Sequence, residues 1–499
     1  MIFKGFEISV GFLIRFPGIF LKIPVPLCSG GLRGADGLKS GLYRKSIKIV
    51  AMWILCWLFL WPPAPGMAEP PTEVSELSLS QAITTAIDKN PNLEAVRFQV
   101  KASDERITQA KSTFFPNVQF VENYSHTTNP MWAFGTKLNQ GAISSPDFDP
   151  NQLNDPDPID NFASTLSVSW PLYDSGQTWY GWQQAKLNRE VTDLVYSRTR
   201  QQIIARTITA YLEVLLSDEN LKVLEQTLET ARIHLKMVNS RFESGFVVKS
   251  DLLRARVHIA DLEQQRLQAT SQTQVARCML NVAMGEPGDR RYQFTTPLEK
   301  GAEVPDDLDV WIETALSNRP ELKQLEQKLV IAQQEIDKSQ AAHLPSFSLL
   351  GNYEVNTEDF QDGHDNYTVG ALVSLNLFSG GGLSAKTAEA RHALEQVKSM
   401  NQALAQQICG ETRQAFYNVR SSWQRIEVSE AAVDQAAESL RIVRNRYESG
   451  LFTIIDLLDA EVVLQQAKTN YLKAVHDHEA AAVQLLLAAG VISENGRSR

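Results

Sequence analysis

The chain carries the stretch RYESGLFTIIDLLDAE at residues 446–461 and a near copy, RFESGFVVKSDLLRAR, at residues 241–256. Each stretch interrupts a pattern in which apolar residues recur every three or four positions, and the pattern resumes within about ten residues. Gly245 and Gly450 mark the two interruptions, and glycine readily adopts the positive φ that a tight turn between helices requires. The repeated stretch therefore predicts two equivalent tips of helical hairpins.

The spacing between the two stretches recurs elsewhere, which predicts an internally duplicated chain. Gly285 matches Gly490 at the same shift, whereas NPNL at residues 90–93 matches RPEL at residues 319–322 at a larger one. The first copy thus has extra residues, which we place in the segment at 129–160, rich in Pro, Asp and Asn and typical of a long surface loop. We expect a first repeat at 69–300, a second at 301–490 and a tail at 491–499.

Within each copy the patterns predict a helix, two strands, a very long helix, a turn and a second long helix. Residues 182–244 contain neither Gly nor Pro, so a continuous helix there would be about 95 Å long. Alternation of apolar residues with a period of two predicts the strands. The alternating positions are Val118, Phe120 and Tyr124; Leu166, Val168, Trp170 and Leu172; Phe347, Leu349, Tyr353 and Val355; and Tyr367, Val369, Ala371, Val373, Leu375 and Leu377.

The N-terminal region predicts a secretory signal. An apolar run at 49–61 follows a basic cluster, precedes small residues that end at Ala68, and is too short to span a bilayer. We therefore expect a leader at 1–68; the alternative is an anchor that stays attached. The leader holds eight of the 48 basic and two of the 58 acidic residues, so the mature chain would carry a net charge of about −16, which argues against nucleic-acid binding.

Little in the sequence predicts chemistry. Two cysteines remain after the leader, Cys278 and Cys409, and both are expected to be small buried hydrophobes in helices. His476 and His478 are two positions apart on a helix and do not share a face, so we expect no metal site there. The GGGLSAK stretch at Gly380 lacks the spacing of a phosphate loop and predicts a turn from strand to helix. With no nucleophile and base pattern, no enzyme or cofactor is expected.

Four strands with alternating apolar residues, in a chain expected to be secreted, raise the question of how they could form a closed membrane barrel. Strands inside a membrane cannot leave open edges, and bacterial barrels have at least about eight strands. Two or three chains must then share one barrel.

At this point the ordered set of features resembles the TolC family of outer-membrane efflux proteins. The resemblance rests on the duplicated plan, the NPNL and RPEL openings, the FFP and LPS strand starts and the two R-[FY]-E-S-G-[FL] turns followed by DLL. It implies a mainly α-helical fold with membrane β structure, in which a homotrimer shares one 12-stranded barrel in outer-membrane lipid. It also implies an α-helical barrel through the periplasm. The tips, at Gly245, Phe246, Gly450 and Leu451, would dock a periplasmic adaptor attached to an inner-membrane pump.

The resemblance further implies a channel entrance gate of acidic residues near the tips. Asp456 and Asp459 stand at the matching positions after the second tip, and Asp251 matches after the first. Phe452 departs from the family, because its best-studied members have a gating arginine at that place. The alternative for Asp251 and Asp456 is charge complementarity to a helix N-terminus.

Capping chemistry differs between the two tips. Thr453 and Asp456 form a T-x-x-D capping pattern, whereas Val248 replaces the threonine in the first copy, so Ser250 is the expected cap there.

The predicted function is a passive conduit of a tripartite efflux or type I secretion system. The alternative is a secreted structural coiled coil or a periplasmic adaptor, which would explain the heptads but would leave the four strands without a purpose.

Overall fold

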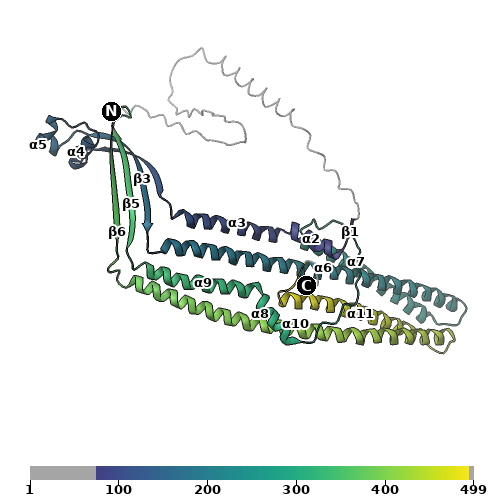
Figure 1. Cartoon of the computed structure of the whole chain (residues 1–499). Helices are drawn as coiled ribbons and strands as arrows, with labels where there is room; N and C mark the ends of the chain where they lie inside the picture. The colour runs from purple at the N-terminus through teal and green to yellow at the C-terminus, as the bar shows by residue number, and fades with distance from the viewer. Residues whose placement is uncertain (1–74, 494–499) are drawn as a thin grey trace, which may run out of the picture. The chain divides into compact units, whose positions relative to one another are not determined.

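The computed structural model of this protein describes residues 75–493. The expected leader and signal peptide at 1–68 lie outside the described residues, as does most of the tail at 491–499. The described residues belong to one compact unit, and Figure 1 shows its long strands at one end of the long helices.

Helices and long strands follow one another in the same order twice along the chain. The first copy comprises α2 (Leu79–Lys89), α3 (Pro91–Ser112), β2 (Asn117–Thr127), β3 (Ile159–Tyr173), α6 (Gln177–Glu243) and α7 (Lys249–Met284). The second comprises α8 (Leu308–Asn318), α9 (Pro320–Ala341), β5 (Ser346–Thr357), β6 (Gly363–Ser374), α10 (Gly382–Glu448) and α11 (Ile454–Ala488). α6 and α10 are each 67 residues long, so the very long helices match in length as well as in place.

Glycines with positive φ mark the same three junctions in both copies. Gly176 and Gly381 precede the very long helices, and their φ values are 93° and 84°. The hairpin turns and the ends of the returning helices also contain glycines with positive φ. A residue with a Cβ adopts this backbone conformation only at a cost in free energy. The turn from strand to helix predicted at GGGLSAK is therefore confirmed, with Gly381 as the N-cap of α10.

The long helices pack as two hairpins, α6 with α7 and α10 with α11 (Figure 1). α3 packs on α6 and α9 packs on α10, so the very long helices have a neighbour along most of their length. Such neighbours are needed because a helix of this length cannot bury its apolar stripe alone. Among the described helices, none has a run long and apolar enough to cross a membrane.

The four long strands form one antiparallel sheet in the order β2, β3, β5, β6. The register pairs Leu166 with Tyr353 and Val168 with Val118, so the alternating apolar residues of neighbouring strands fall on one face. On that face Phe120, Tyr367 and Val369 are 66%, 77% and 77% exposed. The predicted strands are confirmed, except that Leu375 and Leu377 lie beyond the end of β6.

The extra segment of the first copy is more ordered than the expected surface loop. It contains α4 (Pro130–Asn139), a 3-10 helix at Ser145–Phe148 and α5 (Pro150–Asn154). Asn129 caps α4 by accepting hydrogen bonds from the backbone of Met131 and Trp132. Asn and Asp favour both loops and helix caps, so composition alone did not separate the two.

A second, parallel pair of strands was not predicted. β1 (Ser75–Leu77) pairs with β4 (Tyr292–Phe294), and both pack against the middle of α6. There Tyr211 is fully buried and its hydroxyl donates a hydrogen bond to the carbonyl of Leu77 at 3.0 Å. Three residues per strand are too few for a period of two to stand out in the sequence.

Candidate functional site

The two hairpin tips are built by the same backbone turn. Gly245 and Gly450 have φ values of 78° and 76°. Directly after each glycine, the amide of Phe246 or Leu451 donates to a carbonyl five residues back, at 2.9 Å in both tips. This geometry leaves Phe246 82% and Leu451 73% exposed. Each tip therefore presents an apolar side chain to water.

Beneath these exposed residues, the two hairpins share one apolar core. Val238 and Leu252 from the first hairpin pack with Tyr447, Ile454 and Leu457 from the second, and all five are buried. Val238, Tyr447 and Leu457 belong to the apolar patterns that the sequence shows on either side of the two tips. The tips of α6–α7 and α10–α11 are thus one packed unit rather than two independent turns.

Arg241 links the two tips by hydrogen bonds that the sequence did not predict. Its guanidinium donates to the backbone carbonyls of Tyr447 at 3.1 Å and Glu448 at 2.9 Å. It also lies 5.0 Å from the centre of the Tyr447 ring. The last carbonyls of α10 lack partners within the helix, so a cation at this place complements both the carbonyls and the helix dipole.

Phe452 packs partly buried against the core of the tips. Its ring lies 5.4 Å from the guanidinium of Arg446. The hydrogen bonds from an arginine of one hairpin to the end of the other are those of Arg241, in the first copy.

The capping box predicted at the second tip is present. The hydroxyl of Thr453 and its amide both donate to the carboxylate of Asp456, at 2.6 and 2.8 Å. These bonds, the hydroxyl bond first, lower the pKa of Asp456. Asp456 is exposed and carries its charge at neutral pH. Its own amide donates to the hydroxyl of Thr453, the N-cap of α11, at 3.3 Å.

The expected cap at Ser250 is wrong. α7 begins at Lys249 with Val248 as its N-cap, and no side chain caps it. Asp251 is then the third residue of α7, as Asp456 is of α11, and it is half-buried. Asp459 is exposed one turn further along α11.

A buried acidic residue lies further along the same hairpins. The side chains of Glu461 on α11, His234 on α6 and His258 on α7 are 2%, 5% and 11% exposed. His234 Nδ1 contacts one carboxylate oxygen of Glu461, and His258 Nε2 lies 3.6 Å from the other. Burial acts to raise the pKa of Glu461, but the two histidines outweigh it and the pKa lies below its ordinary value.

This histidine–glutamate cluster joins both hairpins about 16 Å from the tips, at 1.5 Å per residue. Its sequence signal was a polar residue at an inward heptad position, since His234 lies between Ala231 and Val238 in the buried stripe. In the described part of the chain, no group of His, Cys, Asp and Glu is arranged to hold a metal ion.

His476, His478 and Cys278 do not form a common site. His478 is buried between the hydroxyl of Ser422 and the carbonyl of Ala302, at 3.2 and 3.4 Å. His476 lies 3.3 Å from Glu213. Cys278 is exposed, contrary to the expectation of a buried position, because it lies off the α7 stripe that buries Ala276 and Leu280.

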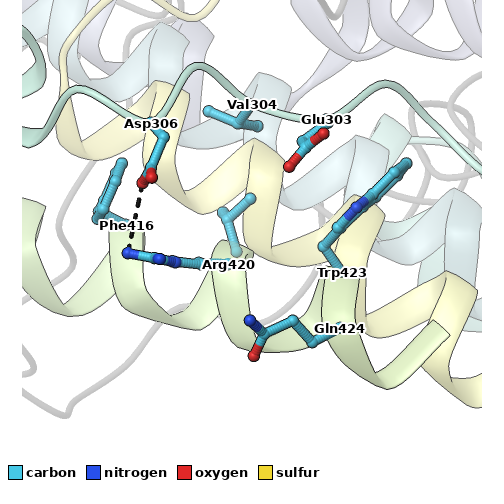
Figure 2. A pocket seen from close by; sticks show the side chains of 8 residues that line it. Glu303, Val304, Asp306, Phe416, Arg420, Trp423 and Gln424 are labelled. Atoms are coloured by element: carbon cyan, nitrogen blue, oxygen red, sulfur yellow. Dashed lines mark ion pairs between the residues drawn. The ribbon is translucent and has the colours of Figure 1, made fainter. Parts of the chain in front are cut away.

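A hollow of about 150 Å³ lies where the segment linking the two copies crosses α10. Figure 2 shows the ion pair of Asp306 with Arg420, at 3.5 Å, on one side and Trp423 on the other. The eight lining residues include no Ser, Cys, His or Lys.

The chain combines paired long-helix hairpins with a four-stranded antiparallel sheet. The family model for outer membrane efflux protein matches residues 82–286 and 311–491, and the chain belongs to that family. It is thus an outer-membrane channel protein, with its helices suited to the periplasm.

Individual relatives agree with this assignment. The alkaline protease secretion protein AprF of Pseudomonas aeruginosa is 23% identical over 426 residues, covering 84% of this chain and 85% of AprF. The outer membrane protein TolC of Escherichia coli is 22% identical over 438 residues, covering 84% of this chain and 83% of TolC. These relatives are channel and secretion proteins, which favours the conduit over the coiled-coil or adaptor alternative.

Solved structures show the same fold. The Campylobacter jejuni CmeC outer membrane channel has a TM-score of 0.70 at 17% identity, with 83% of this chain and 85% of CmeC covered. CusC gives a TM-score of 0.69 at 18% identity, with 83% and 92% covered.

Proposed function

We propose that three copies of this chain form one conduit, with a 12-stranded barrel in outer-membrane lipid and an α-helical barrel in the periplasm. The observation that carries the proposal is the open sheet. Within the described chain, the outer edges of β2 and β6 have no strand partner, and unpaired backbone groups are costly in lipid. Three sheets of four strands, joined β6 to β2, would pair every edge.

The exposed apolar face of the sheet supports the same assembly. Its large side chains suit a lipid boundary, and the opposite face carries Asn, Gln, Ser and Thr, as a water-filled barrel requires. This proposed conduit carries cargo passively across the periplasm and outer membrane, in a tripartite efflux or type I secretion system. An inner-membrane pump supplies the energy.

The hairpin tips are the proposed docking surface for a periplasmic adaptor. Gly245 and Gly450 set the turns, and Phe246 and Leu451 present the exposed apolar contacts. Large apolar side chains at the centre of a small contact surface contribute most to binding between proteins.

Asp456, Asp459 and Asp251 are the proposed acidic lining of the channel entrance. Asp456 can serve as both cap and gate, because its bonds to Thr453 keep it ionised. Arg241 supplies the contact between the tips that Phe452 cannot make.

Site-specific photo-crosslinking tests the docking proposal. A crosslinker placed at Phe246 or Leu451 in living cells is expected to form adducts that peptide sequencing identifies as a periplasmic adaptor. The matched control is Leu267 on α7, which is 66% exposed and lies about 33 Å from the tip along the helix. It should crosslink to a second copy of this chain. Adaptor adducts at Leu267 with none at either tip would contradict the proposal.

A further inference from the structure

The two faces of the four-stranded sheet can be assigned residue by residue from the register. Phe162, Leu166 and Val168 share a face with the apolar residues of β2 and β5. The alternate residues of β3, which include Asn161 and Ser167, share the other face with even-numbered residues of β5 and β6. The pairings Ala163 with Asn356 and Asn356 with His364 fix this polar face.

The extra segment of the first copy, residues 129–158, is attached to the polar face. The amide of Gln140 donates to the side-chain oxygen of Asn161 at 2.9 Å and to the carbonyl of Asp160 at 2.8 Å. Asn161 in turn donates to the side chain of Asn356 at 2.8 Å. These three residues are 8%, 7% and 1% exposed. The hydrogen bond that Gln140 donates to Asn161 therefore joins the segment to a buried polar network on the strands.

A second contact places the segment on the same face of β6. A Cβ added to Gly141 would lie 2.4 Å from the ring of His364, and Gly141 also has a φ of 65°. His364 on β6 and Asn356 on β5 are paired neighbours on the polar face. The segment therefore reaches from β3 across β5 to β6 on one side of the sheet, at the strand ends remote from the helices (Figure 1).

Internal contacts make the segment a structured unit. Lys137 donates to Asp147 at 2.8 Å, and the rings of Phe134 and Phe148 pack edge to face at 5.8 Å. The bonds from Lys137 and Ser144 lower the pKa of Asp147 to about 2. A segment with caps, an ion pair and a ring contact can hold its position over the strand ends.

We propose that residues 129–158 lie over the pore side of the barrel and narrow its outer mouth, so that large solutes cannot enter from outside the cell. This inference rests on the proposed trimeric barrel, because only a closed barrel makes the polar face the pore lining. Three copies of the segment, one from each chain, would meet around the mouth. Selectivity by size at a pore follows from the space that such elements leave.

Access of thiol reagents from outside intact cells tests this proposal. The reporter is the Ser167→Cys variant, on the polar face about 20 Å below Asn161 at the usual rise per strand residue. Cys278 and Cys409 are replaced by serine in every background. A small maleimide and a large polyethylene glycol maleimide are applied from outside. With the segment intact, only the small reagent is expected to label Ser167→Cys.

Three further backgrounds complete the experiment. Replacing residues 130–157 with a short Gly-Ser linker should admit the large reagent, and Gln140→Ala should admit it partly if the deletion fails to assemble. The matched control is Gln152→Ala, an exposed glutamine of the same segment, which should leave labelling unchanged. The Asn151→Cys variant, on the exposed surface of α5, should be labelled by both reagents and confirms that the segment is outside the cell.

Two results would overturn the inference in distinguishable ways. Equal labelling of Ser167→Cys by the large reagent with the segment intact would mean an open mouth, while the barrel itself stands. No labelling by either reagent in any background, with Asn151→Cys labelled, would mean that the polar face does not line a pore, and would overturn the proposed barrel as well.

Discussion

Replacing Glu461 with glutamine is expected to destabilise the helical hairpins by about 3 kcal/mol per chain. Removing one partner of a buried ion pair costs about 3–5 kcal/mol, and we expect the lower end of that range here. Glu461 on α11 contacts His234 on α6 and His258 on α7. Loss of its charge should therefore weaken the packing between the two hairpins. Denaturation of the detergent-solubilised protein, followed by helical circular dichroism, measures the change.

The effect of this substitution should depend on pH in a defined direction. The pKa of Glu461 is below its ordinary value of 4.5 in the folded chain. Its carboxylate therefore stabilises the fold fully above about pH 5, and this contribution is lost as the pH falls through the lowered pKa. The difference in unfolding free energy between the wild type and Glu461→Gln should accordingly decrease as the pH falls through the lowered pKa of Glu461.

The matched control for Glu461 is Glu263→Gln on α7. Glu263 pairs with Arg232 at 3.1 Å, but both side chains are about half exposed, and such pairs contribute about 0–1 kcal/mol. An equal loss of stability in both variants, or a pH-independent effect at Glu461, would contradict a buried ion pair.

Replacing both Asp456 and Asp459 with alanine is expected to weaken the cation selectivity of reconstituted channels. Three chains would place six of these carboxylates around the entrance, and crowded like charges attract cations and repel anions. The reversal potential of the channel in a salt gradient measures the change. Block by multivalent cations should weaken in parallel.

Stability separates the gate from the cap in this double variant. Loss of the Thr453–Asp456 capping box should cost about 1 kcal/mol, with no further loss from exposed Asp459. The control is Asp261→Ala, an exposed acidic residue on α7, which should change neither property. Unchanged selectivity with lowered thermal stability would make both residues caps, and the gate would then be sought at Asp251, Tyr447 and Phe452.

The sequence predicted the fold where a residue type had one physical use. Gly245 and Gly450 interrupt long heptads, and only a turn with positive φ explains a glycine there. The alternation at Leu166, Val168 and Trp170 likewise specified a strand with one apolar face. Thr453 and Asp456 predicted their capping box because both partners lie within one turn.

The sequence failed where the partner is distant along the chain. His234 and Glu461 are neighbours only after both hairpins have packed, and separately each looks like a polar residue on a long helix. The hydrogen bonds from Arg241 to the carbonyls of Tyr447 and Glu448 were not predicted for the same reason. The first tip has Val248 at the place where the second tip has the capping residue Thr453. We therefore expected Ser250 to cap α7, and this was wrong because no side chain caps that helix.

The stoichiometry of the protein extracted from outer membranes tests the central claim most directly. Light scattering in mild detergent, corrected for bound detergent, gives the mass of the protein alone. Because four strands cannot close a barrel, we expect a stable particle of three chains. A stable monomer that retains its strands would contradict the shared barrel and the conduit built on it.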